Sequence, residues 1–279
     1  MTDWPRTGPQ DGAALVAAVN AATGLGLEYA GRLPGGNAGA ALARLGGRDR
    51  VLTRWDGARM ARWPDLAPQL DRLRAAGYPI PRMDLVAVPG GAAAVQERMP
   101  GVPAPYPTPG LVAELIRLVE LQANAVDRPG RTDLYLDGDG PGFCLHGPLR
   151  AYDQRTRELL DWVESVEGDC VGPDLLHLDL HLGNVLVDPD DPDRVTGVVD
   201  WTGPAYGDRR FDLVTLGFDL TRYGEPETAV LDRIGDPAAV RPYAAHMALR
   251  LVDWTIRHDG PADVAVWLAV ADRWRELTA

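Results

Sequence analysis

The residues with the clearest potential for chemistry lie in HLDLHLGNVLVD, residues 177–188. His177 and Asp179 are followed, five residues after the aspartate, by Asn184, which is the form of a catalytic loop for phosphoryl transfer. In such a loop the aspartate accepts the proton of the attacking hydroxyl, and the asparagine binds Mg²⁺. Asp200, in the VVDW segment, adds a second oxygen ligand of the kind that Mg²⁺ prefers.

A predicted β-hairpin connects these two metal-binding positions. Residues 184–188 and 195–201 are rich in β-branched side chains and are separated by the turn-forming stretch DPDDPD. A turn centred on Pro192 gives three pairs, namely Val185 with Val199, Val187 with Gly197, and Asn184 with Asp200. Residues directly opposite on antiparallel strands have Cβ atoms about 4.5–5.5 Å apart. The hairpin would therefore build a metal site from residues that are distant in sequence.

The pattern resembles the aminoglycoside phosphotransferase (choline-kinase-like) superfamily, whose members are relatives of the protein kinases. That superfamily carries H-G-D-x-H-x-x-N, an aspartate at the end of the following hairpin, and a G-D-x-x-x-D-L segment. The matching residues are His177, Asp179, His181, Asn184, Asp200, Gly207, Asp208, Asp212 and Leu213. The resemblance implies that Asp179 is the catalytic base and that Asn184 and Asp200 hold Mg²⁺. Leu178 departs from the usual glycine.

The surrounding elements predict a bilobal α+β fold of the protein-kinase type. The first part has the order strand, strand, strand, helix, strand, strand, which is that of an N-terminal lobe with an antiparallel sheet and a helix. We expect a nucleotide-binding lobe at 1–98, a hinge at 96–101, and a mainly helical catalytic and acceptor-binding lobe at 99–279 that carries the catalytic hairpin. The expected elements are a helix at 11–23, strands at 27–33, 40–46 and 50–55, a helix at 67–77, two strands within 83–99, helices at 110–126 and 151–166, and helical stripes at 240–254 and 264–274.

Several residues are expected to bind the nucleotide. Gly35 and Gly36 can lay backbone N–H groups over phosphates because they carry no Cβ, and Asn37 offers a polar contact. An ordinary glycine-rich turn is the alternative. By resemblance, main-chain groups of the segment from Gln96 to Met99 would bind the adenine edge, although Met99 fits plain packing equally well.

The superfamily places a lysine on its third strand, where it contacts the nucleotide phosphates and pairs with an acidic residue on a helix. All 28 Lys and Arg residues of this chain are arginine, so another residue must take this position. VLTR offers Arg54 in one register and Thr53 in the other, and only one of the two can point into the cleft. We favour Arg54, because a cation near the phosphates is the physical requirement. Asp65 and Asp71 are the candidate acidic partners.

The composition of the chain favours some classes of binding partner over others. The net charge of −12 argues against nucleic acid, whose phosphates need basic patches. It is compatible with a small cationic substrate drawn into an acidic cleft. No long apolar run predicts a membrane span or a signal peptide, and the two cysteines are typical of a cytoplasmic protein. The acidic residues that could line the cleft are Asp219, Glu225, Asp253 and Asp259.

These features lead to one main functional prediction and two alternatives. The main prediction is an Mg²⁺-dependent O-phosphotransferase that moves the γ-phosphoryl of ATP or GTP to a hydroxyl of a cationic antibiotic, thereby conferring resistance. The antibiotic would be an aminoglycoside or a basic cyclic peptide such as capreomycin or viomycin. Asp179 would be the base, and His177 would brace the loop through hydrogen bonds or act as a base itself. The alternatives are a kinase for a small metabolite, such as an amino alcohol or a sugar, and a catalytically silent nucleotide- or drug-binding protein.

Overall fold

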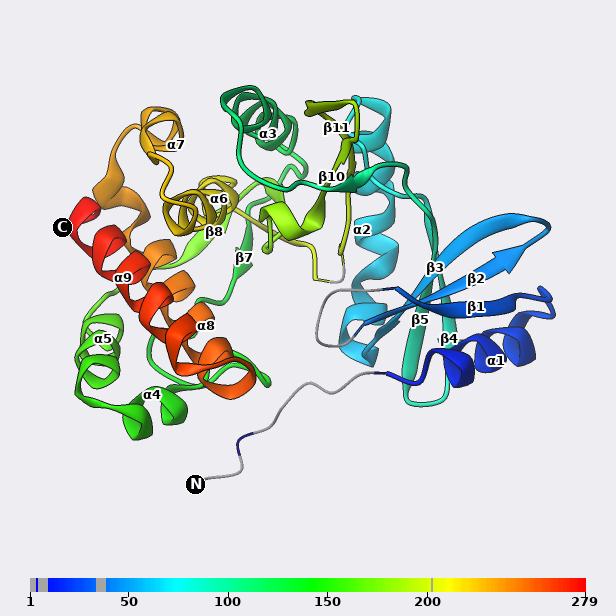
Figure 1. Cartoon of the computed structure of the whole chain (residues 1–279), viewed down its shortest axis with the longest axis horizontal. Coiled ribbons are helices and arrows are strands. Elements are labelled where there is room, and N and C mark those ends of the chain that lie inside the picture. Colours follow the sequence, from blue (N-terminus) through cyan, green and yellow to red (C-terminus); the bar gives the residue numbers. More distant parts are fainter. Residues whose placement is uncertain (1–3, 5–9, 34–38, 202) are drawn as a thin grey trace.

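The N-terminal part of the chain forms a five-stranded antiparallel sheet, which Figure 1 shows on the side of the molecule opposite the C-terminal helices. The computed structural model describes Trp4 and residues 10–33, 39–201 and 203–279. The strand order is β1-β2-β3-β5-β4. The strands are β1 (Glu28–Leu33), β2 (Ala40–Leu45), β3 (Arg48–Trp55), β4 (Met83–Val88) and β5 (Gly91–Glu97).

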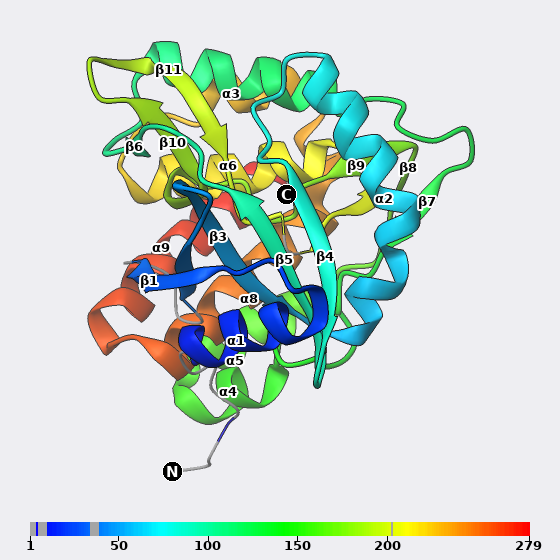
Figure 2. The ribbon, with the colours of Figure 1, turned by 90° about the vertical axis from the view of Figure 1, so that its right-hand side faces the viewer.

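One helix covers each face of this sheet, and this identifies the face that each strand residue occupies. Helix α1 (Gly12–Thr23), capped by the side chain of Asp11, lies across the outer face in Figure 2 and shares a buried cluster with Leu52. Helix α2 (Gly57–Ala75) packs on the inner face in a cluster that contains Trp55. Because strand side chains alternate, even-numbered residues at this end of β3 face α1 and odd-numbered residues face α2.

Helix α2 begins at Gly57, well before the predicted start at residue 67. Pro64 and Pro68 lie inside it. Each proline lacks the N–H for one helical hydrogen bond and is usually found in the first turn, so the sequence favoured a later start. The leucines on the inward face of this helix are buried although the two prolines each leave out one helical hydrogen bond. These residues are Leu66, Leu70 and Leu73.

The rest of the chain is mainly helical, which confirms the predicted fold class. A large core cluster joins most of its helices, and α6 is buried along nearly its whole length. The α-helices are α3 (Pro109–Leu121), α4 (His146–Tyr152), α5 (Gln154–Glu164), α6 (Arg210–Arg222), α7 (Thr228–Ile234), α8 (Arg241–His258) and α9 (Pro261–Leu277); the 3₁₀ helices are η1 (Leu182–Asn184) and η2 (Pro237–Val240). The short strands are β6 (Val102–Pro103), β7 (Gly130–Thr132), β8 (Cys170–Gly172), β9 (Asp174–Leu176), β10 (Val185–Asp188), β11 (Asp191–Val198) and β12 (Ala205–Gly207).

The predicted hairpin is present as β10 and β11, but the predicted register is wrong. Asp188 pairs with Asp191, so the turn lies at Pro189 and Asp190 instead of Pro192. The Asp188 carboxylate accepts a hydrogen bond from the Asp190 N–H (2.9 Å), and the fixed φ of Pro189 suits the second turn position. Irregularities within the hairpin then shift the remaining pairs. These are Val185 with Val198, Leu186 with Gly197, and Val187 with Val195.

The chain leaves the sheet after Glu97, and β6 then pairs with β10 of the catalytic hairpin. The division into lobes at residues 98 and 99 stays a prediction. In the part of the chain that the structure describes, no helix is long and apolar enough to cross a membrane. Cys144 and Cys170 are both buried and free.

Candidate active site

Asp179 and Asn184, two residues of the predicted catalytic loop, lie together in the structure. The Asn184 side-chain amide donates to the main-chain oxygen of Asp179 (2.9 Å) and lies 3.4 Å from its Oδ2. The Asn184 carbonyl accepts a hydrogen bond from the Val199 N–H (2.9 Å), next to Asp200. Asn184 is therefore bonded to Val199 where the predicted register had paired it with Asp200, and Asp200 follows Val199 in the chain.

His177 holds this loop in shape. Its Nε2 lies 2.8 Å from the Val199 carbonyl oxygen, and its Nδ1 accepts a hydrogen bond from the Asp179 N–H (3.2 Å). The ring is buried and packs edge-on against Trp201, with centroids 4.6 Å apart. Both nitrogens are engaged by the main chain, so the geometry is that of a brace.

Two carboxylates on α6 fix the backbone of the loop. Asp212 accepts hydrogen bonds from the N–H groups of His177 (2.7 Å) and Leu178 (2.9 Å), and Asp219 accepts one from Leu182 (2.8 Å). The two aspartates are seven residues apart and therefore lie on one helix face. Burial raises the pKa of Asp212, although the hydrogen bonds and the charge of His177 act in the opposite direction.

Arg250, which the sequence did not single out, is brought by α8 to Asp179, the predicted base. Its Nη2 lies 2.9 Å from Asp179 Oδ1, and its Nη1 donates to the Leu178 carbonyl. The side chains of Arg250 and Asp179 are 23% and 34% exposed, so the ion pair borders solvent. One signal was present in the sequence: Arg250 follows Tyr243 by seven residues and Met247 by three, which places it on the inward stripe of the helix.

The surroundings of Asp179 keep its carboxylate ionised. Burial alone would raise the pKa of Asp179, but the charge of Arg250, together with the neighbouring imidazoles and the hydrogen bond from Asn184, outweighs it and lowers the pKa. The imidazole Nε2 of His181 lies 3.8 Å from Asp179 Oδ2. A carboxylate in this state can accept a proton from a hydroxyl.

The structure corrects the favoured register of β3. Arg54 lies on the α1 face with Leu52, is exposed, and donates to the Pro89 carbonyl (2.9 Å). Thr53 lies on the inner face with Trp55, where its hydroxyl accepts a hydrogen bond from Gln96 (3.0 Å). Because side chains alternate along a strand, only one of the two residues can face the inner side of the sheet, and in β3 that residue is Thr53.

Asp65 and Asp71, the candidate acidic partners, are engaged elsewhere. Asp71 forms an ion pair with Arg74 on the surface of α2, and the main-chain oxygen of Asp65 accepts a hydrogen bond from Tyr206 (3.0 Å). Neither contact connects these residues with Thr53.

The remaining predicted nucleotide residues have different outcomes. Gly35, Gly36 and Asn37 lie outside the described residues. Gln96 is buried beside Thr53. Met99 borders a surface hollow of about 660 Å³, and its Cβ lies so close to Gly197 that a Cβ there would be 2.9 Å away. The Met99 side chain therefore packs against the catalytic hairpin, and the adenine contacts stay a prediction.

The donor atoms at Asn184 and Asp200 suit a hard cation. The Asn184 amide nitrogen is used within the loop, which leaves its oxygen as the ligand atom. Asp200 is exposed and has a left-handed backbone (φ 65°). Mg²⁺ usually binds through one or two protein oxygens together with substrate phosphates. Across the described ranges no group of three or more His, Cys, Asp or Glu side chains could hold a metal ion, and a site of two oxygen ligands does not need one.

Of the four acidic residues expected to line a cleft, two are buried and two are exposed, and the acidic cleft itself stays a prediction. Asp219 and Asp253 are buried and serve the fold. Asp253 accepts hydrogen bonds from Arg257 (2.7 and 2.8 Å) and from the Leu145 N–H (3.0 Å). Glu225 and Asp259, in contrast, are exposed.

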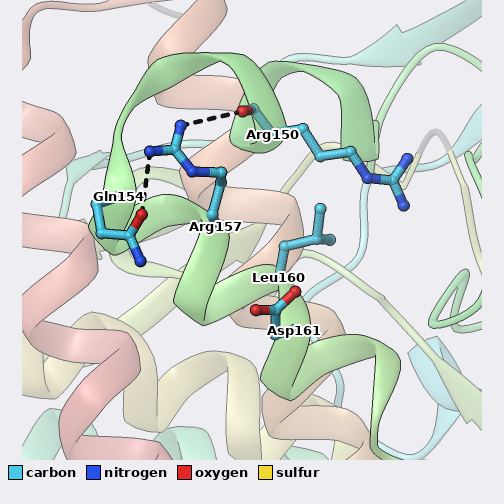
Figure 3. Close-up of a pocket in the computed structure, with 5 residues that line it drawn as sticks. All are labelled: Arg150, Gln154, Arg157, Leu160 and Asp161. Carbon is cyan, nitrogen blue, oxygen red and sulfur yellow. Dashed lines mark hydrogen bonds between the residues drawn. The ribbon is translucent and has the colours of Figure 1, made fainter.

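A second hollow, of about 360 Å³, lies on α4 and α5 and contains none of the predicted site residues (Figure 3). Its two arginines are already engaged. Arg157 donates to Gln154 (3.1 Å) and to the Arg150 carbonyl (3.4 Å), and the Arg150 guanidinium pairs with Glu164. We assign it no role in the chemistry.

Comparisons with known proteins identify the family and show similar folds. A model of the phosphotransferase enzyme family matches residues 30–247. A thermostable mutant of aminoglycoside phosphotransferase APH(4)-Ia is 19% identical, with 91% of this chain and 96% of that chain covered and a TM-score of 0.59. The corresponding values are 18%, 98%, 95% and 0.57 for an aminoglycoside phosphotransferase from Alicyclobacillus acidocaldarius. For choline kinase LicA from Streptococcus pneumoniae they are 13%, 95%, 99% and 0.60. No match was found among curated protein sequences.

Proposed function

Because this chain belongs to the phosphotransferase enzyme family, we propose that it moves the γ-phosphoryl group of ATP or GTP to a hydroxyl of a small molecule. One observation carries the proposal: the ionised, partly exposed Asp179 carboxylate lies beside Asn184 in a loop that α6 holds from behind. Related structures support a nucleotide as the phosphoryl donor, since complexes of APH(4)-Ia variants contain ADP or AMP-PNP with hygromycin B.

The proposed chemistry assigns a task to each group. Asp179 accepts the hydroxyl proton as the acceptor oxygen bonds to the γ-phosphorus. The bond from that phosphorus to the β–γ bridging oxygen breaks, and its electron pair leaves with the nucleoside diphosphate. When bound, Mg²⁺ on Asn184 and Asp200 neutralises phosphate charge. His177 keeps the loop rigid and takes no proton, because both of its nitrogens are bonded to the main chain.

For the acceptor, our first proposal is a cationic antibiotic, either an aminoglycoside or a basic cyclic peptide such as capreomycin or viomycin. The activity would confer resistance. The net charge of −12 and the hygromycin B complexes of APH(4)-Ia support this class. The exposed Glu225 and Asp259 are the groups that remain for amine recognition.

A second candidate, a small-metabolite kinase, is favoured by a specific contact. Arg250 places a positive charge directly beside Asp179, which disfavours an acceptor with a cation next to the reacting hydroxyl and therefore favours a sugar over an amino alcohol. Related structures also include a putative fructosamine-3-kinase.

The test is a screen for phosphoryl transfer. Purified protein is incubated with Mg·ATP or Mg·GTP and with two panels, one of cationic antibiotics and one of sugars and amino alcohols. Nucleoside diphosphate release and a phosphoryl mass shift of the acceptor are both measured. Asp179→Asn protein serves as the control for contaminating kinases. Turnover in one panel identifies the acceptor class, whereas nucleotide binding without turnover in either panel would favour a silent binding protein.

A further inference from the structure

Among the residues that the structure describes, the inner face of β3 does not carry the cation that the resemblance to the superfamily leads us to expect there. Strand β3 presents Thr53 to the inner face, and Arg54 lies on the opposite face with its guanidinium bonded to the Pro89 carbonyl. The sequence contains no lysine. The transition state spreads negative charge over the transferred group, and catalysis depends largely on neutralising it. Another part of the chain has to supply this charge.

Helix α8 brings a guanidinium to the other side of the reaction centre. One Arg250 nitrogen bonds to Asp179 Oδ1 and another to the Leu178 carbonyl, so the planar group is fixed in orientation. About a quarter of the side chain stays exposed, which leaves N–H donors for a ligand. His181 is a weaker candidate, because it lies 3.8 Å from Asp179 and its Nδ1 already accepts a hydrogen bond from the Gly183 N–H (3.1 Å).

Geometry brings this guanidinium close to the phosphoryl group. A general base lies about 2.6–3.2 Å from the hydroxyl that it deprotonates. The attacking oxygen lies about 3–3.5 Å from the phosphorus. Since Arg250 touches the base itself, the transferred phosphoryl passes within reach of its remaining donors.

We propose that Arg250 is a further catalytic residue, which contacts the transferred phosphoryl group and fixes Asp179 Oδ1 so that Oδ2 faces the acceptor. The inference rests on the proposed function. It places the catalytic cation on the acceptor side of the cleft, on α8, in place of the strand lysine. Arginine suits this position because its forked donors can bind a carboxylate and a phosphoryl oxygen at the same time.

The experiment measures how strongly Mg·ADP and Mg·GDP bind with and without aluminium fluoride, which mimics the planar transferred phosphoryl group. Arg250→Gln removes the charge but keeps an N–H donor for the Leu178 carbonyl. We expect the wild-type gain in affinity from fluoride to fall by about tenfold or more, because a hydrogen bond to a charged group is lost. Binding of the diphosphate alone should change less than about twofold, since in the proposed arrangement Arg250 contacts the transferred phosphoryl group and not the diphosphate.

Three further variants separate contact from positioning. Asp179→Asn should lose less of the fluoride gain than Arg250→Gln, because the Arg250 guanidinium is still present in the asparagine variant. Arg250→Lys should lose part of the gain, since it keeps the charge without the fork. Arg233→Met, which removes an arginine paired with Glu120 on the surface, should behave as wild type. Thermal unfolding checks that each variant is folded. If Arg250→Gln does not fold, the fluoride gain of Arg250→Lys is the measurement that tests the inference.

The outcomes are distinguishable. A wild-type gain in Arg250→Gln or an undiminished gain in Arg250→Lys would overturn the inference, and so would equal losses in Arg250→Gln and Asp179→Asn. Wild-type protein that binds the diphosphates without any fluoride gain would overturn it too, while leaving nucleotide binding intact. Wild-type protein that binds neither diphosphate would instead defeat the proposed function, and the inference with it.

Discussion

The two sides of the proposed cleft are built differently. On the catalytic side, buried carboxylates of α6 hold the main chain of the loop at His177, Leu178 and Leu182, and Arg250 holds Asp179. On the nucleotide side, β3 offers an uncharged Thr53 where related enzymes have a lysine. The comparison shows that, among the described residues, charged side chains gather around the loop that carries Asp179, whereas the inner face of β3 presents an uncharged hydroxyl at Thr53.

The largest effect should follow from removing the base on the catalytic side. Asp179→Asn should lower kcat by at least about 10²–10⁴-fold, because no group remains to accept the proton. Mg-nucleotide affinity should stay nearly unchanged, since Asn184 and Asp200 are retained. Steady-state kinetics and nucleotide titration check the two statements separately. A variant with the wild-type rate would show that Asp179 is not the base.

The next largest effect should come from the α6 carboxylate that holds the loop. Asp212→Ala leaves the buried N–H of His177 and the partly buried N–H of Leu178 without their acceptor. Each such loss costs about 1–3 kcal/mol, and a small displacement of the base can lower kcat by about 10²-fold. Calorimetry and kinetics should therefore both respond.

The matched control for this change is Asp272→Ala. Its carboxylate pairs with Arg155 at the surface, where both side chains are 48% exposed. Exposed pairs contribute about 0–1 kcal/mol, so unfolding and kcat should barely change. Similar losses in the two variants would mean that the support from α6 is not special.

The sequence predicted well which loop residues lie together, because they follow a local pattern with fixed spacing. His177, Asp179 and Asn184 fall within eight residues, and the hairpin leading to Asp200 could be recognised from valine content and turn residues. The register failed because two candidate turns lie within DPDDPD, and the choice between them depends on the hydrogen bond from Asp190 to Asp188. A local pattern thus predicts that a hairpin exists better than it predicts the register.

The supporting residues were harder to predict because their partners are distant in sequence. Asp219 was assigned to an open acidic cleft, yet it bonds to Leu182, which lies 37 residues earlier. Arg250 meets Leu178 across 72 residues. Helical spacing places Arg250 on an inward face, but nothing in the sequence identifies its partner, or that of Asp219, until the helices are packed together. The Arg54 register failed for a related reason, since the faces of β3 are defined only by the helices that cover them.

A smaller effect should separate backbone strain from packing at Leu178. Its φ of +68° is unfavourable for any residue with a Cβ and worst for a β-branched one. Leu178→Val should therefore destabilise the fold by about 1–3 kcal/mol. Leu178→Gly should cost less, because relief of strain offsets the lost contacts. Denaturant unfolding of the two variants gives the order, and a more stable valine variant would show that packing dominates at this position.

The smallest effect should be at Arg54, and it tests the comparison between the two sides directly. The guanidinium is exposed on the outer face and bonds to the Pro89 carbonyl, so Arg54→Ala should change the KM for nucleotide less than about twofold. Thr53→Val, which removes the acceptor for the buried Gln96 side chain, should raise this KM more. The KM values of both variants for ATP and GTP, measured side by side, provide the check. A tenfold rise in Arg54→Ala alone would return the phosphate-binding cation to β3, and the reason for assigning that charge to Arg250 on α8 would disappear.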